Sequence, residues 1–296
     1  MSRAARFTVG RLTCWTLEGG VQRLDGGAMF GVVPKPLWER HAHADERNRI
    51  PLALRCLLVE HADGLVLVDT GLGNKETAKF RDIYGVENAG SSGPTALEDA
   101  LGEAGHAAAD VRWVINTHLH FDHAGGNTFK PEAGEAALAF PNATYLVQKG
   151  ELGFASHPNE RTAASYLAAN FAPVAAAGRF RLVSGEVTVL PGVRVLPTPG
   201  HVPFHQSVLV SDGGEVACFL GDLVPTAAHL PAPWIMGYDL EPLVTLQTKK
   251  RVLSRAAAEQ WQVVFGHDPE VARGRLAVDA RHGYAPEPVD MVRVGA

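Results

Sequence analysis

The sequence predicts an α/β fold of one domain. Segments with strand-like apolar runs and segments with helical periodicity alternate along all 296 residues, and neither a linker nor a shift in composition separates them. Histidine and aspartate side chains follow several of the predicted strands, at their carboxyl ends. Loops anchored on a rigid sheet hold side chains to the tolerance that metal chemistry demands. We therefore expect a single domain over residues 1–296 with one site at the strand ends.

Composition excludes several classes of protein. Apolar residues make up 46% and charged residues 20% of the chain, as in globular proteins with a substantial core. A net charge of −5 disfavours a nucleic-acid-binding surface, and no apolar run approaches the roughly 18 residues of a membrane span. Residues 1–7 lead into no signal-peptide core, and the three cysteines indicate no disulfide framework. We expect a cytoplasmic protein with a small-molecule substrate, without nucleic-acid or membrane partners, and the sequence leaves a homodimer open.

The N-terminal part of the chain predicts three strands and a long loop. Residues 7–18 alternate loosely in polarity, as a strand does, whereas residues 19–50 show no clear periodicity. A long irregular stretch in a compact protein is usually functional or disordered, and the aromatic content of this one disfavours disorder. Strands over 54–61 and 65–69 are joined by Ala62-Asp63-Gly64, a hairpin turn. We therefore expect a functional loop over 19–50.

The rest of the chain mixes strands and helices. A short helix over 95–105 has Leu97 and Leu101 on one face and leads into the apolar run 111–116, a buried strand. The further predicted strands are 143–148, 187–190, 193–196, 206–211, 215–220 and 261–265. The further predicted helices are two Ala-rich pieces within 149–177, including 160–170, then 242–260 with Pro242 in its first turn, and a short helix around 270–280. Periodicity alone thus indicates the α/β class.

The most specific pattern directly follows the strand at 111–116. His118, His120, Asp122 and His123 fall within six residues. Imidazole and carboxylate are ligands that borderline divalent metals such as zinc prefer. In an extended segment the first three alternate onto one side, and His123 begins to turn to the other. Four candidate ligands in this arrangement indicate two metal ions.

This segment resembles the signature of the metallo-β-lactamase superfamily. The superfamily's other motifs follow in order as Pro199-Gly200-His201, Gly221-Asp222 and Gly266-His267-Asp268, and Asp69-Thr70-Gly71 is a further shared feature. The stretch from residue 25 to residue 38 is similar to a narrower branch, the quorum-quenching N-acyl-homoserine lactonases. The resemblance implies a four-layer αββα sandwich.

The resemblance also implies a role for each matching residue. Seven side chains would bind two divalent ions, zinc in the first instance and manganese or iron otherwise. They are His118, His120 and His201 on one ion, Asp122, His123 and His267 on the other, and Asp222 between them. Asp69 and His205 would support the ligands from behind. A turn residue and a packed histidine are the structural alternatives for these two.

Two such ions imply hydrolysis. A hydroxide that bridges ions about 4 Å apart forms near neutral pH and attacks a carbonyl carbon, while a metal polarises the carbonyl oxygen. Asp122 would pass a proton to the leaving oxygen. The implied substrate is a lactone or related ester, such as an N-acyl-homoserine lactone. Phosphotriester or aryl ester hydrolysis, iron-dependent oxidoreductase chemistry on the same fold and a non-catalytic metal-binding module are the alternatives.

Further side chains are candidates for contacting the substrate. Three apolar residues suit the wall of a pocket for an apolar tail, with core packing as an equal alternative: Met29, Phe30 and Trp234. The glycines around residues 25–38 suit a mobile wall. Many of the lactonases have a tyrosine three residues after the bridging aspartate, where this chain has Pro225, which offers no donor. His229, a second candidate catalytic residue, or Tyr238 would replace that donor, unless the substrate differs.

Overall fold

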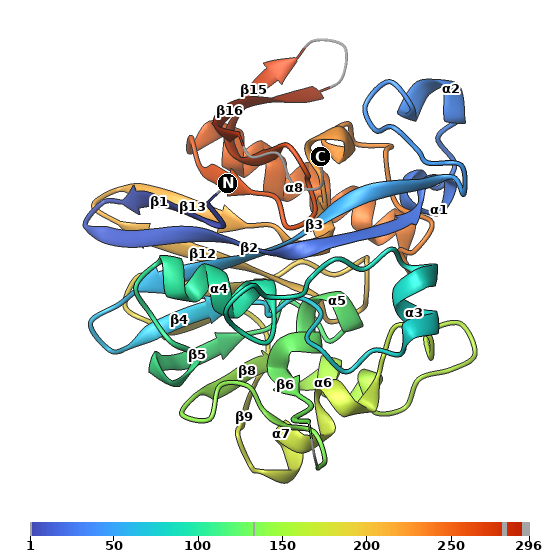
Figure 1. The fold of residues 1–296 in the computed structure, drawn as a ribbon. Coiled ribbons are helices and arrows are strands. Elements are labelled where there is room, and N and C mark those ends of the chain that lie inside the picture. The colour runs from blue at the N-terminus through green and yellow to red at the C-terminus, as the bar shows by residue number, and fades with distance from the viewer. Residues whose placement is uncertain (1, 133, 280–282, 292–296) are drawn as a thin grey trace.

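Two β-sheets face each other in the protein, which we describe from a computed structural model that covers residues 2–132, 134–279 and 283–291 (Figure 1). The first sheet has seven strands in the spatial order β1 (Ala4–Val9), β2 (Leu12–Asp25), β3 (Arg49–Glu60), β4 (Leu65–Val68), β5 (Val111–Ile115), β8 (Thr144–Gln148) and β9 (Phe180–Val183). The second sheet also has seven strands, in the order β10 (Val187–Leu190), β11 (Val193–Pro197), β12 (Gln206–Asp212), β13 (Glu215–Phe219), β14 (Gln262–Val264), β15 (Val271–Asp279) and β16 (Gly283–Met291). A small third sheet pairs β6 (Thr128–Phe129) with β7 (Ala137–Leu138).

The two sheets pack on each other through apolar side chains. Leu57 of β3 belongs to the same buried cluster as Val208 of β12. The next residue on each strand, Leu58 or Leu209, points to the opposite face and packs in an outer cluster. Because both faces of each sheet are buried, the central strands read as continuous apolar runs in the sequence rather than as alternating ones.

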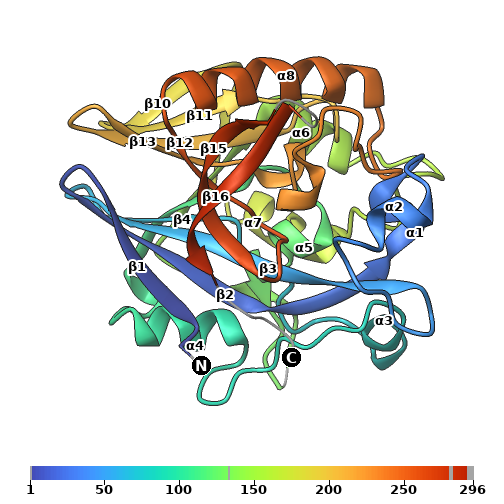
Figure 2. The same cartoon turned by 90° about the horizontal axis from the view of Figure 1, so that it is seen from above.

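Helices form the two outer layers (Figure 2). The helices of the described residues are α1 (Gly26–Phe30), α2 (Lys35–Trp38), α3 (Ala78–Ile83), α4 (Ala96–Glu103), α5 (Phe121–Ala124), α6 (Lys149–Ala155), α7 (Ala172–Ala176) and α8 (Pro242–Ala258). Of these, α4 and α8 cover opposite outer faces, whereas α1, α2 and α5 lie between the outer layers in Figure 2. Leu97 and Leu101 of α4 pack on the outer face of the first sheet, and Val252 and Leu253 of α8 pack on that of the second. This arrangement confirms the expected four-layer αββα sandwich. Of the helices in the described residues, none is long and apolar enough to cross a membrane.

The strand ends of both sheets meet at one edge of the sandwich. In the first sheet β4 and β5 run parallel, so the segments that follow them, at Asp69 and at 116–123, start side by side. In the second sheet β13 and β14 run parallel, and Asp222 and His267 follow them. The two sheets are joined at this edge, because the Ala53 N–H donates to the His267 carbonyl at 3.0 Å. The topology therefore carries the expected ligands to one place.

The expectation of an irregular loop over 19–50 is wrong for its first part. β2 continues to Asp25 after a bulge between Glu18 and Val21, because it pairs with β3 along its whole length. Two short helices, α1 and α2, then bring Met29, Phe30 and Trp38 into one buried cluster. A methyl group at Gly26 would lie 2.5 Å from the Trp38 ring, so the glycine permits close packing here. This packing does not fit a mobile wall.

The predicted helix over 160–170 is also wrong. The structure has turns there, with only a short 3-10 helix at Ala168–Asn170. The side chain of Asn159 accepts hydrogen bonds from the N–H groups of Arg161, at 3.0 Å, and Thr162, at 3.1 Å. Such bonds offer the backbone an alternative to the helix. These side-chain hydrogen bonds therefore favour turns over the helix that the Ala-rich composition predicts.

The predicted short helix around 270–280 is a strand in its described part. β15 pairs antiparallel with β14 on one side and with β16 on the other. Hydrogen bonding to a neighbouring strand on each side outweighs the local helical pattern. Residue 280 lies outside the described residues. The single strand predicted over 7–18 is wrong, because β1 ends at Val9 and β2 begins at Leu12, so a hairpin turn lies within that range. The remaining predicted strands and the helix at 242–260 agree with the structure to within about five residues.

Candidate metal centre

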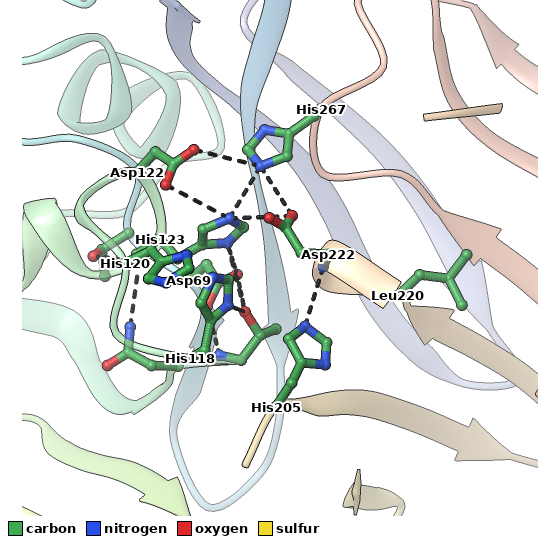
Figure 3. A network of polar contacts seen from close by, with 12 residues as sticks. Asp69, His118, His120, Asp122, His123, His205, Leu220, Asp222 and His267 are labelled. Carbon is green, nitrogen blue, oxygen red and sulfur yellow. Dashed lines mark hydrogen bonds and ion pairs between the residues drawn. The ribbon is translucent and has the colours of Figure 1, made fainter. Parts of the chain in front are cut away.

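Seven buried side chains converge where the strand ends meet. Figure 3 labels all of them except His201. His120 is extended and directly precedes α5, the short helix that carries Asp122 and His123. His201 lies in the loop after β11, Asp222 in a 3-10 helix after β13, and His267 just after β14. The seven are His118, His120, Asp122, His123, His201, Asp222 and His267. Residues from four separate segments of the chain thus share one centre.

The ligand atoms of these residues form three groups, and within each group all the atoms lie within 4.8 Å of one another. The groups are His118, His120 and His201; Asp122, His123 and His267; and His118, His123 and Asp222. Asp222 lies between the first two groups, because its Oδ2 is 3.3 Å from His201 Nε2 and its Oδ1 is 3.1 Å from His267 Nε2. The structure brings together the two sets that the resemblance implies.

Hydrogen bonds at the back of three imidazole rings fix which nitrogen faces the centre. The Nδ1 atoms of His123, His201 and His267 lie 2.8, 2.9 and 2.7 Å from Asp69 Oδ2, Asp239 Oδ1 and the Ala53 carbonyl oxygen, respectively. These partners only accept, so each Nδ1 carries a proton and donates it. Each Nε2 can therefore offer a lone pair to a metal.

The centre brings acceptor atoms together without donors between them. His123 Nε2 is 3.0 Å from His267 Nε2 and 3.2 Å from Asp222 Oδ1. His118 Nε2 and Asp222 Oδ1 are buried and have no hydrogen-bond partner in the described residues. Lone pairs that converge in a buried site need a cation between them. Imidazole nitrogen and carboxylate oxygen are the donors that zinc and similar ions take, so these residues fit a divalent metal.

The charges in the centre are coupled through space. Burial lowers the pKa of His118 well below its ordinary value, and the neighbouring imidazoles lower it further. Burial also acts to lower the pKa of His123, but the surrounding carboxylates, Asp222 foremost, outweigh it and raise that pKa well above its ordinary value. Burial acts to raise the pKa of Asp222, yet the imidazoles lower it well below its ordinary value. The centre thus attracts positive charge, for which protons and a metal ion compete.

Asp69 lies behind the centre. It follows β4 with a φ of 56°, a conformation that few residues other than glycine and asparagine adopt readily. Its Oδ1 accepts from the Thr117 N–H at 2.7 Å and its Oδ2 from the Thr117 hydroxyl at 2.8 Å, besides holding His123. The carboxylate therefore fixes both the start of the ligand segment and the orientation of one imidazole.

We expect Asp69→Asn to weaken metal retention without unfolding the protein. The amide has the same shape and tolerates the positive φ, but it loses the charge that holds the His123 Nδ1 proton. Affinity for metal, measured by competition with a chelator, should fall about 10–100-fold. Asp63→Asn, in the exposed turn between β3 and β4, is the control and should bind metal as the wild type does. Equal metal affinity in the two variants would contradict the supporting role.

His205 supports Asp222 directly. The Asp222 N–H donates to His205 Nε2 at 3.1 Å, and His205 Nδ1 lies 2.8 Å from the Thr198 hydroxyl. Burial lowers the pKa of His205 to about 3, so the ring is neutral and its Nε2 can accept. A methyl group at Gly221, whose φ is 56°, would lie 2.6 Å from that nitrogen. Gly221 and His205 together set the position of the Asp222 backbone.

A cavity of about 450 Å³ opens above the centre. Several of the converging residues form its polar part, together with Arg161, Thr162 and Ser165. The rest of the lining is mostly apolar: Leu24, Ala28, Met29, Leu52, Phe121, Met236 and Leu240, with the phenols of Tyr84 and Tyr238. Two of the predicted substrate contacts, Met29 and Tyr238, therefore do line this cavity.

The other predicted contacts lie elsewhere. Phe30 and Trp234 line a second cavity of about 410 Å³. The ring of His229 stacks on Phe30, with a distance of 4.6 Å between ring centroids. Its Nε2 is 2.8 Å from the Met29 carbonyl oxygen and its Nδ1 is 2.7 Å from the Thr226 hydroxyl. Both ring nitrogens are thus engaged in hydrogen bonds, and the ring is packed on Phe30. This geometry does not support the predicted catalytic role of His229.

Comparison with known proteins places the chain in a family. The model of the metallo-beta-lactamase superfamily matches residues 50–267. The chain belongs to this superfamily. Among curated proteins, an N-acyl homoserine lactonase from Bacillus sp. is 31% identical over 232 residues, which is 76% of this chain and 85% of that relative. The expected class of metal-dependent hydrolases, with lactonases among the relatives, is therefore confirmed.

Solved structures of the superfamily agree with the fold. A probable metal-dependent hydrolase from Staphylococcus aureus superposes with a TM-score of 0.86 at 28% identity, covering 98% of this chain and 99% of its own. AidC, a dizinc quorum-quenching lactonase with a bound product, superposes with a TM-score of 0.80 at 22% identity, covering 98% of each chain. At that identity the second match supports the fold alone.

Sequence reasoning missed three residues that hold this superfamily site together. Asp239 accepts from His201, Gln22 donates to Asp122, and Glu151 accepts from the Leu119 N–H, between two ligands, at 3.0 Å. Burial raises the pKa of Glu151 to about 7. None of the three lies in a motif. Only Gln22 had a signal in the sequence. With β2 extended to Asp25, Gln22 is a polar residue on a buried part of the strand, which points to a function.

Proposed function

We propose that this protein is a dinuclear metal-dependent hydrolase that opens lactones, with N-acyl-homoserine lactones as its substrate class. The observation that carries this proposal is the seven-residue ligand set at the base of a cavity whose other walls are largely apolar. A lactone head group would meet the ligands, and an acyl tail would lie against the apolar wall. The lactonases among the relatives favour this chemistry.

Two ions, zinc foremost, suit the donor set. Two groups of three ligands with one shared carboxylate provide for two ions rather than for one closed four-ligand site. Two divalent ions held there would lower the pKa of a water molecule and polarise the substrate carbonyl. The three cysteines are free and buried, which suits the reducing conditions of the cytoplasm.

Asp122 is the proposed proton carrier of the reaction. Its carboxylate lines the cavity and is 3.6 Å from His267 Nε2, so it borders both the substrate space and the centre. A carboxylate in this place can take a proton from the attacking water and pass it to the leaving alkoxide oxygen of the lactone. Ring opening then produces a carboxylate and an alcohol on one molecule.

Tyr238 is the proposed donor that replaces the tyrosine absent at Pro225. Tyr238 lines the cavity, and burial raises its pKa, so its hydroxyl keeps its proton. The segment that carries it is tied to a ligand, because the Leu240 N–H donates to the His201 carbonyl at 3.0 Å and Asp239 accepts from the His201 ring. Tyr84 also lines the cavity, but it lies at the end of the short helix α3.

We expect Tyr238→Phe to lower kcat/KM for lactones about tenfold, the effect of one lost hydrogen bond to substrate. The ring and its packing stay, so metal content should not change. Tyr84→Phe is the matched control and should stay within about twofold of the wild type. A larger loss in the Tyr84 variant than in the Tyr238 variant would assign the donor to Tyr84 instead.

Metal analysis and a substrate panel test the proposal as a whole. Protein purified without chelator should carry close to two divalent ions per chain. Activity on N-acyl-homoserine lactones should exceed that on aryl esters and phosphotriesters, and kcat/KM should rise about fourfold per methylene until the tail fills the cavity. A single bound ion at excess metal would refute the dinuclear site. Faster phosphotriester turnover, or no response to tail length, would refute the substrate class.

A further inference from the structure

Gln22 stands directly behind one of the converging carboxylates. It lies in β2 opposite Leu52 of β3, and its side chain is fully buried. Its amide Nε2 donates a hydrogen bond to Asp122 Oδ2. Gln22 is not part of the cavity lining, so a substrate in the cavity would not touch it. It can therefore act on the reaction only through Asp122.

The Asp122 carboxylate has few other constraints. His267 Nε2 is 3.6 Å from its Oδ2 and His123 Nε2 is 3.9 Å from its Oδ1, and neither is close enough for a hydrogen bond. Within the described residues, Gln22 is the one side chain that donates a hydrogen bond to this carboxylate. Asp122 sits in α5, a helix of only four residues that does not by itself fix the direction of a side chain.

The amide oxygen of Gln22, Oε1, is buried and has no hydrogen-bond partner in the part of the chain that the structure describes. A buried and unpaired amide oxygen destabilises the fold, and an apolar side chain of the same length would avoid that penalty at this strand position. Among the described residues, the contact with Asp122 is thus the one polar interaction of the Gln22 side chain.

We propose that Gln22 is a positioning residue, which holds the Asp122 carboxylate toward His123 and His267 and so secures one half of the metal centre. The role of Asp122 rests on the proposed function. An amide suits the task because it donates without adding a positive charge that would compete with a metal ion. Gln22 would orient the Asp122 carboxylate in the same way that Asp239 and Asp69 orient the imidazoles they hydrogen-bond.

The test is the rate at which a chelator removes metal from Gln22→Met. Methionine has a similar length but no donor. At saturating metal the variant should still bind two ions, but one of them should be lost about 10–100-fold faster than in the wild type and the other at an unchanged rate. For lactone hydrolysis kcat should fall about tenfold or more, while KM stays within about twofold, because Gln22 lies outside the cavity.

Gln148→Met is the matched control. Gln148 is also a buried amide in the first sheet, with its Nε2 2.9 Å from the Gly185 carbonyl oxygen and 2.8 Å from Gln206 Oε1, away from the cavity lining. If Gln22→Met releases metal no faster than Gln148→Met, the proposal is overturned. If Gln22→Met does not fold, Gln22→Leu takes its place, since leucine is also apolar and has no donor, and wild-type metal retention in that variant overturns the proposal equally.

Metal release needs no substrate, so the two proposals fail separately. A wild type that binds two ions but opens no lactone would refute the substrate assignment. The comparison of Gln22→Met with Gln148→Met would still decide the positioning role.

Discussion

Asp222→Ala should remove both metal ions and abolish hydrolysis. The carboxylate lies 3.2 Å from His123 Nε2, 3.1 Å from His267 Nε2 and 3.3 Å from His201 Nε2, so it faces both halves of the centre. Without it, imidazoles from both halves lose the negative charge that draws cations to them. The loss should exceed the roughly 10–100-fold effect of removing a residue behind a ligand. Metal analysis and kcat/KM measure it.

Asp212→Ala is the control for this change. Asp212 is the last residue of β12, the strand that pairs with β13. The Asp212 carboxylate binds the exposed side chain of Arg11 on the surface. This variant should keep wild-type metal content, because exposed ion pairs contribute little to stability. Full activity in Asp222→Ala would show that the site is misassigned.

Asp122→Asn should produce the second largest loss. The amide has the shape of the carboxylate and can still accept from Gln22, so the fold and one metal site should persist. It cannot take up a proton, however, and kcat should fall about 10²–10⁴-fold, the usual contribution of a positioned proton carrier. Metal content should fall less than in Asp222→Ala. Asp122 lies in one ligand group only, with His123 and His267, whereas Asp222 lies between that group and the other.

Esters with good leaving groups provide an internal control for Asp122. An activated aryl ester needs no proton on its leaving oxygen, so Asp122→Asn should lose less activity on it than on a lactone. An equal loss on both substrates would indicate that Asp122 acts only in holding metal. Near wild-type turnover of the lactone would assign proton transfer to another group.

The sequence by itself indicated the α/β class and the candidate ligand set. His118, His120, Asp122 and His123 are readable because they lie within one short segment directly after a strand, where backbone geometry alone brings them close together. The resemblance to the superfamily added His201, Asp222 and His267, and the last two directly follow the apolar runs of the parallel strands β13 and β14. Local patterns of this kind survive in a sequence without knowledge of its neighbours in space.

The tertiary structure alone decided which side chains face the cavity and which support the ligands. Phe30 and Met29 are adjacent in the chain, yet Met29 lines the cavity above the centre and Phe30 stacks on His229 away from it. The same holds for Gln22 and Asp239, whose partners Asp122 and His201 lie far along the chain. Such contacts depend on the packing of distant segments, which no local periodicity records.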